Sequence, residues 1–289
     1  MNQNPNKTQF LGLETSYDNA ESVIIPVPYE RTATWLKGTA EGPQRILEAS
    51  LQLEGFNYEM QDVISEKVGI HTLEELDIRE KNSEDMIESV NNTVSKVLND
   101  VKKPVLLGGE HSISIGAVQA MHKTYSSIAV LSLDAHADLR NEFLGNKYNH
   151  GCTMRRIREI AKQVVQVGVR SYSKEEDEYI REEGINQEVI GVKFDVEEII
   201  DQLPEEIYVS VDLDVFDPSE VPAVGTLQPG GLMWRETLDL LKEIGDRKTI
   251  LGFDITELSP REKDVRSEFL AAKLTYMLMG YSFTERFKD

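Results

Sequence analysis

Short apolar runs of strand length alternate along this chain with longer stretches that have helical spacing. The run Ile128–Leu133 is apolar almost throughout, which is typical of a strand buried on both faces. The other runs are rich in β-branched residues and end in polar or glycine positions. The six predicted strands are Ser22–Val27, Pro104–Leu107, Ile128–Leu133, Val164–Val169, Ile207–Val211 and Thr249–Ile255.

The stretches between the strands predict helices. In Ser83–Leu98 the apolar residues Met86, Val90, Val94 and Val97 recur at spacings of three and four, and Ser83 is the expected N-cap. The other predicted helices are Gly42–Ala49, Ile113–Lys123, Thr153–Ala161, Lys174–Glu182, Val196–Gln202, Arg235–Ile244 and Arg266–Met279.

This alternation of strands and helices predicts an α/β fold with a mostly parallel sheet between two layers of helices. The charge-rich stretch Glu74–Glu84 is interpreted as a loop. Because no repeat or linker interrupts the pattern, we expect a single domain over residues 1–289.

Composition narrows the classes of function. The 289 residues include 31 Lys and Arg against 51 Asp and Glu, a formal net charge of −20, which disfavours a broad basic surface for nucleic acid. One cysteine excludes an internal disulfide. No apolar run approaches the roughly 20 residues of a membrane span, and Met1–Thr8 lacks a signal-peptide core. We therefore expect a cytoplasmic protein whose acidic surplus is mostly solvated surface.

Three predicted strands run directly into clusters of His and acidic residues. Because the carboxyl ends of parallel strands meet at one edge of a sheet, these clusters are expected to converge on one crevice. The three segments are Gly108-Gly-Glu-His111-Ser112, Asp134-Ala-His136-Ala-Asp138 and Asp212-Leu-Asp214-Val-Phe-Asp217-Pro218.

Alternate residues of an extended chain point to one side, so Asp134, His136 and Asp138 are expected to share a side, as are Asp212 and Asp214. Buried carboxylates need compensation, which divalent cations provide. Two His and four Asp exceed the ligands of one zinc site and suit two metals. Oxygen-rich ligands favour Mn²⁺, with Fe, Ni, Co and Zn left open.

Each cluster taken alone has a plainer interpretation. A lone Asp at a strand end is often a helix cap or turn former, and Asp217 before Pro218 is interpreted in that way. The metal interpretation depends on all three clusters lying at strand ends of one chain.

These motifs resemble those of the ureohydrolase (arginase/agmatinase) family. Further segments share the resemblance: Gly38–Pro43, Asn149-His150-Gly151, Gly225-Thr226, Gly230-Gly231 and Asp254-Ile-Thr-Glu257-Leu-Ser-Pro260. The resemblance implies a three-layer αβα sandwich around a mostly parallel sheet of about eight strands. It also implies a homo-oligomer, either a trimer or a hexamer.

The resemblance further implies a binuclear centre of two Mn²⁺ per subunit, whose bridging hydroxide attacks a guanidinium carbon to release urea and an amine. Glu257 would grip the guanidinium, His150 would pass a proton to the leaving amine, Asp138 would relay a proton, and Thr226 would contact the guanidinium region. The implied metal ligands are His111, Asp134, His136, Asp138, Asp212 and Asp214.

The implied substrate is agmatine, which would yield putrescine for polyamine synthesis. The segment Leu139–Asn149 lacks the Ser/Thr/Asn-rich run with which arginase-like members receive an α-carboxylate. The guanidinium of Arg140 could receive the carboxylate of a substrate. Arginine, guanidinobutyrate, guanidine and formimidoylglutamate therefore remain alternative substrates. An amide hydrolase of the deacetylase type and a non-catalytic scaffold are the rival classes.

The remaining residues of chemical interest have structural interpretations. His71 and His122 are interpreted as structural residues. Cys152, Trp35 and Trp234 are expected to pack, although Trp35 lies on a segment that in the family can border the entrance to the site.

Overall fold

A parallel sheet of eight strands forms the middle of the protein, whose computed structural model describes residues 9–288. Along the sheet the strand order is β4-β1-β5-β10-β9-β6-β7-β8, and every neighbouring pair is parallel. The predicted parallel sheet is therefore confirmed. In chain order the strands are β1 (Ser22–Val27), β4 (Ile70–Thr72), β5 (Lys103–Gly108), β6 (Ala129–Leu133), β7 (Gln163–Val167), β8 (Val189–Ile190), β9 (Glu206–Asp212) and β10 (Thr249–Thr256).

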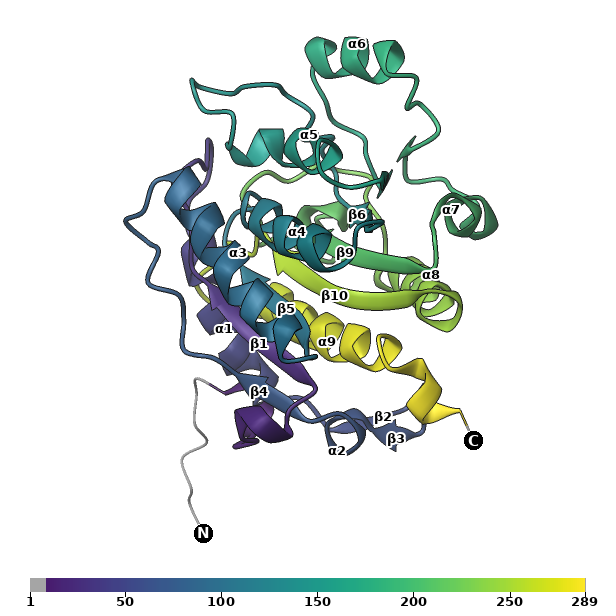
Figure 1. Ribbon diagram of the computed structural model, residues 1–289. Helices are drawn as coiled ribbons and strands as arrows, with labels where there is room; N and C mark the ends of the chain where they lie inside the picture. Colours follow the sequence, from purple (N-terminus) through teal and green to yellow (C-terminus); the bar gives the residue numbers. More distant parts are fainter. Residues whose placement is uncertain (1–8, 289) are drawn as a thin grey trace.

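Helices cover both faces of this sheet and make it the middle of three layers (Figure 1). One face is packed by α3 (Ser83–Asn99), α4 (Ile113–Thr124), α5 (Thr153–Arg158) and α6 (Lys174–Glu182). The opposite face is packed by α1 (Gly42–Ser50), α7 (Val196–Gln202), α8 (Trp234–Arg247) and α9 (Arg266–Tyr281). The short helix α2 (Ile64–Lys67) follows an antiparallel pair of two-residue strands, β2 (Phe56–Asn57) and β3 (Asp62–Val63).

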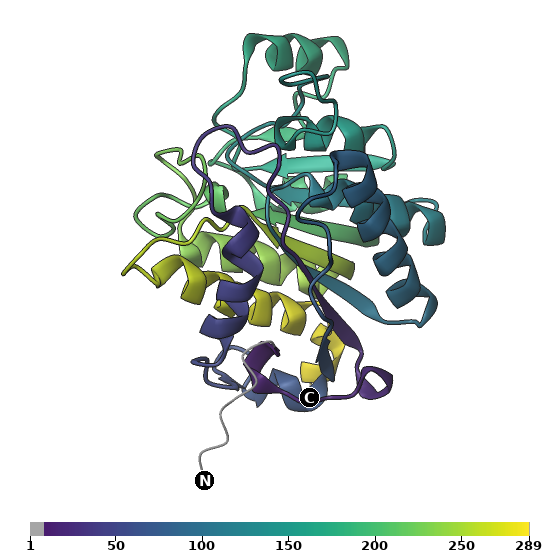
Figure 2. The same cartoon turned by 90° about the vertical axis from the view of Figure 1, so that its left-hand side faces the viewer.

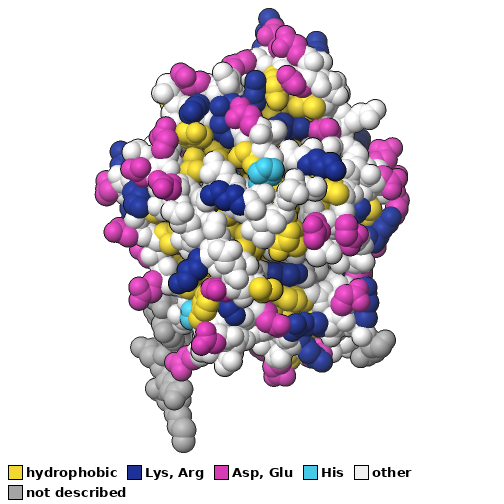
Figure 3. Space-filling model, in the orientation of Figure 1, with side chains coloured by type: hydrophobic (Ala, Val, Ile, Leu, Met, Phe, Trp, Pro, Cys, Tyr) yellow, Lys and Arg dark blue, Asp and Glu magenta, His cyan; other side chains and the backbone are white. Residues whose placement is uncertain are grey.

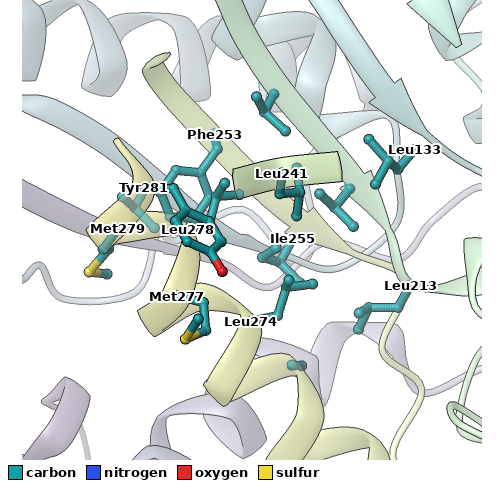
Figure 4. Close-up of a cluster of buried hydrophobic side chains, with 14 of the residues drawn as sticks. Leu133, Leu213, Leu241, Phe253, Ile255, Leu274, Met277, Leu278, Met279 and Tyr281 are labelled. Atoms are coloured by element: carbon teal, nitrogen blue, oxygen red, sulfur yellow. The ribbon is translucent and has the colours of Figure 1, made fainter. Parts of the chain in front are cut away.

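Two hydrophobic cores result, because successive residues of a strand point to opposite faces. In β1, Ile24 packs into the core under α1 and α9, whereas Val23 and Ile25 pack into the core under α3 and α4. Figure 4 shows the first core, where Phe253 and Ile255 of β10 face side chains of α8 and α9. Burying a side chain of this size, compared with leaving it exposed to water, contributes about 1.5–3 kcal/mol to the free energy of folding.

The predicted elements are all present, with differences at their ends. The N-cap of α3 is Asn82 rather than Ser83: the Asn82 side chain accepts the Asp85 N–H at 2.8 Å. Ser83 is instead buried and accepts a hydrogen bond from Asn146. Helix α5 ends at Arg158, three residues earlier than predicted. The strands β4 and β8 were not predicted, because two or three residues are too few to show a period.

The topology brings four consecutive strands, β5-β10-β9-β6, side by side in the middle of the sheet. All four run in the same direction, so the segments that leave them begin at one edge. The segment that follows β1 arches over this part of the molecule before α1 begins (Figure 2). Within residues 9–288, no helix combines the length and the apolar character that crossing a membrane requires.

The surface view is consistent with a solvated acidic surplus. On the face in Figure 3, acidic and basic side chains are interspersed, without a broad field of one sign. The net charge of −20 therefore does not by itself mark a binding face.

Candidate metal centre

Two histidines organise a cluster of carboxylates at the edge where β5, β9 and β6 end. The Nδ1 atom of His111 lies 3.2 Å from oxygens of both Asp134 and Asp138, and 3.4 Å from Asp212. The Nδ1 atom of His136 lies 2.8 Å from Asp214 and 3.7 Å from Asp134. The structure thus brings all six sequence-predicted ligands together.

The ligand atoms form two groups that share one residue. The first group contains His111, Asp134 and Asp212, and the second contains Asp134, His136 and Asp214, with the ligand atoms of each group within 4.8 Å of one another. A carboxylate shared between two groups suits two neighbouring cations.

The two aspartates at the carboxyl end of β9 divide between the two ligand groups. Asp212 lies with His111 and Asp214 lies with His136, and both aspartates face the same pocket, as the sequence predicted. The chain has left the extended conformation there: Asp214 lies in a 3-10 turn, Leu213–Val215, and Asp138 has a φ of 51°. Strand alternation therefore does not extend past the end of either strand.

The buried charge of this cluster fits divalent cations. Asp134 is fully buried, and its Oδ2 atom has no hydrogen-bond partner within the described residues. Burial, together with the neighbouring charges of Asp214 and Asp138, raises the pKa of Asp134 to about 7. Burial opposes protonation of His136, but the charge of Asp214 outweighs it and raises the pKa of the imidazole to about 10. Divalent cations at this place would hold the carboxylates ionised.

A chain of hydrogen bonds behind His111 fixes its ring. Its Nε2 atom lies 3.0 Å from the hydroxyl of Ser210, which donates to Asp254 at 2.7 Å, and Tyr208 donates to the other Asp254 oxygen at 2.8 Å. Because the Ser210 proton is directed to Asp254, Ser210 accepts from Nε2–H. The Nδ1 lone pair of His111 is therefore left for a metal.

The sequence did not predict these hydrogen bonds behind His111, although Asp254 stands out as an acidic residue inside an apolar strand. We expect Tyr208→Phe to lower the free energy of unfolding by about 1–3 kcal/mol, since it leaves one oxygen of the buried Asp254 without a donor. Urea denaturation measures this change. Tyr58→Phe, at a site 83% exposed, is the control, and equal stability of the two variants would contradict the role given to Tyr208.

A second unpredicted residue, Arg170, ties the segment that carries Asp214 to two other segments of the chain. Its half-buried guanidinium donates to five backbone carbonyls at 2.8–3.3 Å, those of Gly168, Asp214, Val215, Phe216 and Gln228. The Gln228 amide nitrogen in turn lies 3.4 Å from Nε2 of His136. The spacing of these residues in the sequence gives no signal for this contact.

The metal cluster forms the floor of a pocket of about 330 Å³. Glu257 lies beside the floor, where its Oε1 atom accepts the backbone N–H of His111 at 2.7 Å. Its φ is 65°, a strained value for this residue type, which the Glu257 N–H bond to the Gly109 carbonyl helps to hold. His150 and Thr226 also line the pocket, so these predicted site residues all meet in one place.

Arg140 lines the pocket but already has partners. Its guanidinium stacks over the Phe143 ring at 4.6 Å, and its Nε atom lies 3.9 Å from the buried carboxylate of Glu176. Glu176 itself accepts the Leu139 N–H at 2.9 Å and caps α6 through Ser173. The positive charge of Arg140 is thus largely balanced.

The other single residues divide as follows. Trp35 was expected to pack, but it is 74% exposed and lines the mouth of the pocket. Trp234 stacks on Phe216, and Cys152 is buried. Asp217 accepts the Ser219 N–H and hydroxyl in a turn, as predicted.

The two remaining histidines lie outside the pocket. His71 contacts the Thr15 carbonyl at 2.7 Å, and His122 is exposed on α4.

Comparison with known proteins gives one consistent family. The sequence profile described as Arginase family matches residues 20–280. An N(1)-aminopropylagmatine ureohydrolase from Synechocystis sp. is 36% identical, over 94% of this chain and 93% of its own length. An agmatinase from Pyrococcus horikoshii is 34% identical, over 91% of this chain and 93% of its own length.

The fold agrees with the sequence comparison. The crystal structure of an agmatine ureohydrolase of Thermoplasma volcanium superposes with a TM-score of 0.86 at 30% identity, covering 96% of each chain. The chain therefore belongs to the arginase family of ureohydrolases.

Proposed function

We propose that this protein hydrolyses the guanidino group of agmatine, or of agmatine extended by an aminopropyl group, and releases urea. The observation that carries the proposal is the placement of Glu257 beside the two carboxylate–histidine groups, in one pocket. A carboxylate there can bind a planar guanidinium through paired hydrogen bonds and orient its carbon toward the metal cluster.

The residues divide the chemistry among them. Two divalent cations, for which the oxygen-rich ligand set favours Mn²⁺, would supply a water of lowered pKa as the nucleophile. With the cations bound, Asp138 would relay a proton from the attacking water toward the leaving nitrogen, and Glu257 would hold the guanidinium in place. His150 would deliver the second proton to the leaving nitrogen. Both protons of the water then end on that nitrogen, so that a cationic guanidinium and water become urea and an alkylammonium ion.

The charge of the pocket supports a cationic substrate without a carboxylate. Arg140 is the one basic Lys or Arg side chain among the described residues that line the pocket, and Glu176 balances it. A guanidino acid would need a free cation or a set of neutral donors to receive its carboxylate, and the segment Leu139–Asn149 lacks a Ser/Thr/Asn-rich run that could supply such donors. Agmatine carries only an amine at that end, so hydrolysis would give putrescine, a polyamine precursor.

A second candidate substrate is N(1)-aminopropylagmatine, the compound in the name of the Synechocystis relative. Exposed aromatic side chains, Trp35 and Tyr172, line the pocket beyond the metal cluster. Aromatic faces of this kind bind ammonium groups by cation–π attraction, which favours a substrate with an additional amine. The product would be the corresponding triamine.

A urea-release assay over a set of guanidino compounds tests this proposal. Agmatine and N(1)-aminopropylagmatine are expected to show kcat/KM values at least about tenfold above those of arginine, guanidinobutyrate, formimidoylglutamate and guanidine, a ratio that one or two unmatched polar contacts produce. A chelator should stop urea release, and added Mn²⁺ should restore it.

Each alternative substrate or function predicts a different combination of urea release, deacetylation and metal binding. Highest activity on a guanidino acid would overturn the substrate assignment. Metal-loaded protein that releases no urea from any compound would overturn the enzymatic proposal. Deacetylation without urea release would favour the amide-hydrolase class, and binding of metal alone would favour a scaffold.

The family resemblance also leads us to propose a cytoplasmic homo-oligomer, a trimer or a hexamer. Light scattering on the purified chain, whose protomer mass is 32.7 kDa, reports the number of subunits directly.

A further inference from the structure

Glu110 is a buried carboxylate that the proposed chemistry does not use. It directly precedes His111 and is fully buried, yet it is not among the described side chains that line the pocket. A buried carboxylate is stable only where donors compensate for its lost hydration. Its partners therefore indicate what it does.

Three donors, all of them neutral, hold this carboxylate. The Thr32 backbone N–H donates to Oε2 at 2.7 Å, and the Thr32 hydroxyl donates to Oε1 at 2.7 Å. The Ser112 hydroxyl also donates to Oε1, at 2.6 Å. Thr32 lies between β1 and α1, in the segment that arches over the molecule after β1 (Figure 2). Both oxygens of Glu110 thus hold one residue of that segment.

Thr32 passes this constraint to His150. The Thr32 hydroxyl oxygen accepts the backbone N–H of His150 at 2.9 Å and lies 3.4 Å from Nδ1 of the same residue. The Thr32 proton is directed to the carboxylate, the nearer and stronger acceptor, so the oxygen can only accept from the ring. The neutral ring then carries its hydrogen on Nδ1 and its lone pair on Nε2.

We propose that Glu110 is a positioning residue that fixes the place and the tautomer of His150 through Thr32. The proposal rests on the proposed function in one respect, the role of His150 in proton transfer. Its geometric content, the link from Glu110 through Thr32 to the imidazole, is independent of which substrate is hydrolysed.

Kinetics of single and double variants test the link. Glu110→Gln keeps the shape but replaces one acceptor by a donor, so kcat should fall about 10- to 100-fold, as for other groups that orient a catalytic residue, while KM and metal content stay within about threefold. Thr32→Val should show a similar loss, and Thr32→Ser should recover most of kcat. Because Glu110 and Thr32 act as one unit, the double variant Glu110→Gln/Thr32→Val should lose no more kcat than the more damaged of the two single variants.

A matched control separates this effect from general damage to the fold. Glu268 is also a buried glutamate, 5% exposed, in α9 and outside the pocket lining, so Glu268→Gln should leave kcat unchanged. Losses that multiply in the double variant, or a Glu110→Gln enzyme with unchanged kcat, would overturn the proposal. If Glu110→Gln does not fold, the Thr32→Val and Thr32→Ser pair still decides the question.

A second measurement does not depend on catalysis. Nitrogen-15 spectra of the five histidines in the full chain, prepared without paramagnetic metal and assigned with His150→Asn, report the tautomer. We expect the Nδ1–H form of His150 in the unchanged protein and a mixture of tautomers in Glu110→Gln and Thr32→Val. An unchanged tautomer in both variants would contradict the proposal even if no guanidino compound is hydrolysed, so the two failures are distinguishable.

Discussion

Replacing Asp134 by asparagine is expected to abolish urea release and to lower metal affinity more than about 100-fold. Loss of a partner behind a metal ligand already costs about 10–100-fold, and Asp134 is the residue that both ligand groups share. The amide keeps one oxygen but brings an N–H₂ group into a site built from acceptors. Metal analysis of the purified variant, together with its urea release at limiting Mn²⁺, measures both losses.

The control for Asp134→Asn is Asp195→Asn. Asp195 is the N-cap of α7, where its side chain accepts the Glu197 N–H at 2.8 Å, and asparagine caps a helix equally well. The control should keep full metal content and activity. An Asp134→Asn enzyme with normal turnover at limiting Mn²⁺ would show that the carboxylate cluster is not the metal centre.

Replacing Glu257 by glutamine should separate substrate binding from metal binding. The amide keeps an oxygen for the His111 N–H but loses the charge that pairs with a guanidinium. Removing one partner of an enclosed charge pair costs about 2–5 kcal/mol, which corresponds to a fall in kcat/KM of about 30- to 4,000-fold. Metal content should stay at the level of the unchanged enzyme.

Glu262→Gln, an exposed position five residues along the same segment, is the matched control for this loss. Steady-state kinetics with agmatine and metal analysis on the same samples give the two readings. If Glu257→Gln loses metal in proportion to its activity, Glu257 supports the metal cluster instead of holding the substrate.

The sequence contains enough information to predict where the chemistry lies, because that information is local. Each of three apolar runs is long enough to be a strand, and each ends in His or Asp. Parallel strands bring such ends to one edge, so the convergence of His111, Asp134 and Asp212 follows from the alternation alone.

The pairing inside the cluster was not predictable in this way. Strand alternation cannot show that Asp214 lies with His136, since Asp138 and Asp214 both lie beyond the strands: Asp138 has a positive φ, and Asp214 lies in a 3-10 turn. Such backbone conformations depend on tertiary contacts, one of which is the Ala135 N–H bond to Asp214 at 3.0 Å.

Residues that act through long-range contacts give still less signal. Thr32 and Glu110 are separated by 78 positions, and the Thr32 segment has no motif that indicates a link to His150. The short edge strands β4 and β8 also give little signal in the sequence, because pairing with their neighbours defines them more than their own residues do.

Anomalous diffraction tests most directly the proposal that two cations share one carboxylate-rich site. Crystals of the full chain grown with Mn²⁺, with data collected on both sides of the manganese absorption edge, should show two anomalous peaks, one beside His111 and one beside His136, with Asp134 between them. A single peak, or peaks only at surface carboxylates while the enzyme in the crystal remains active, would contradict a two-metal centre.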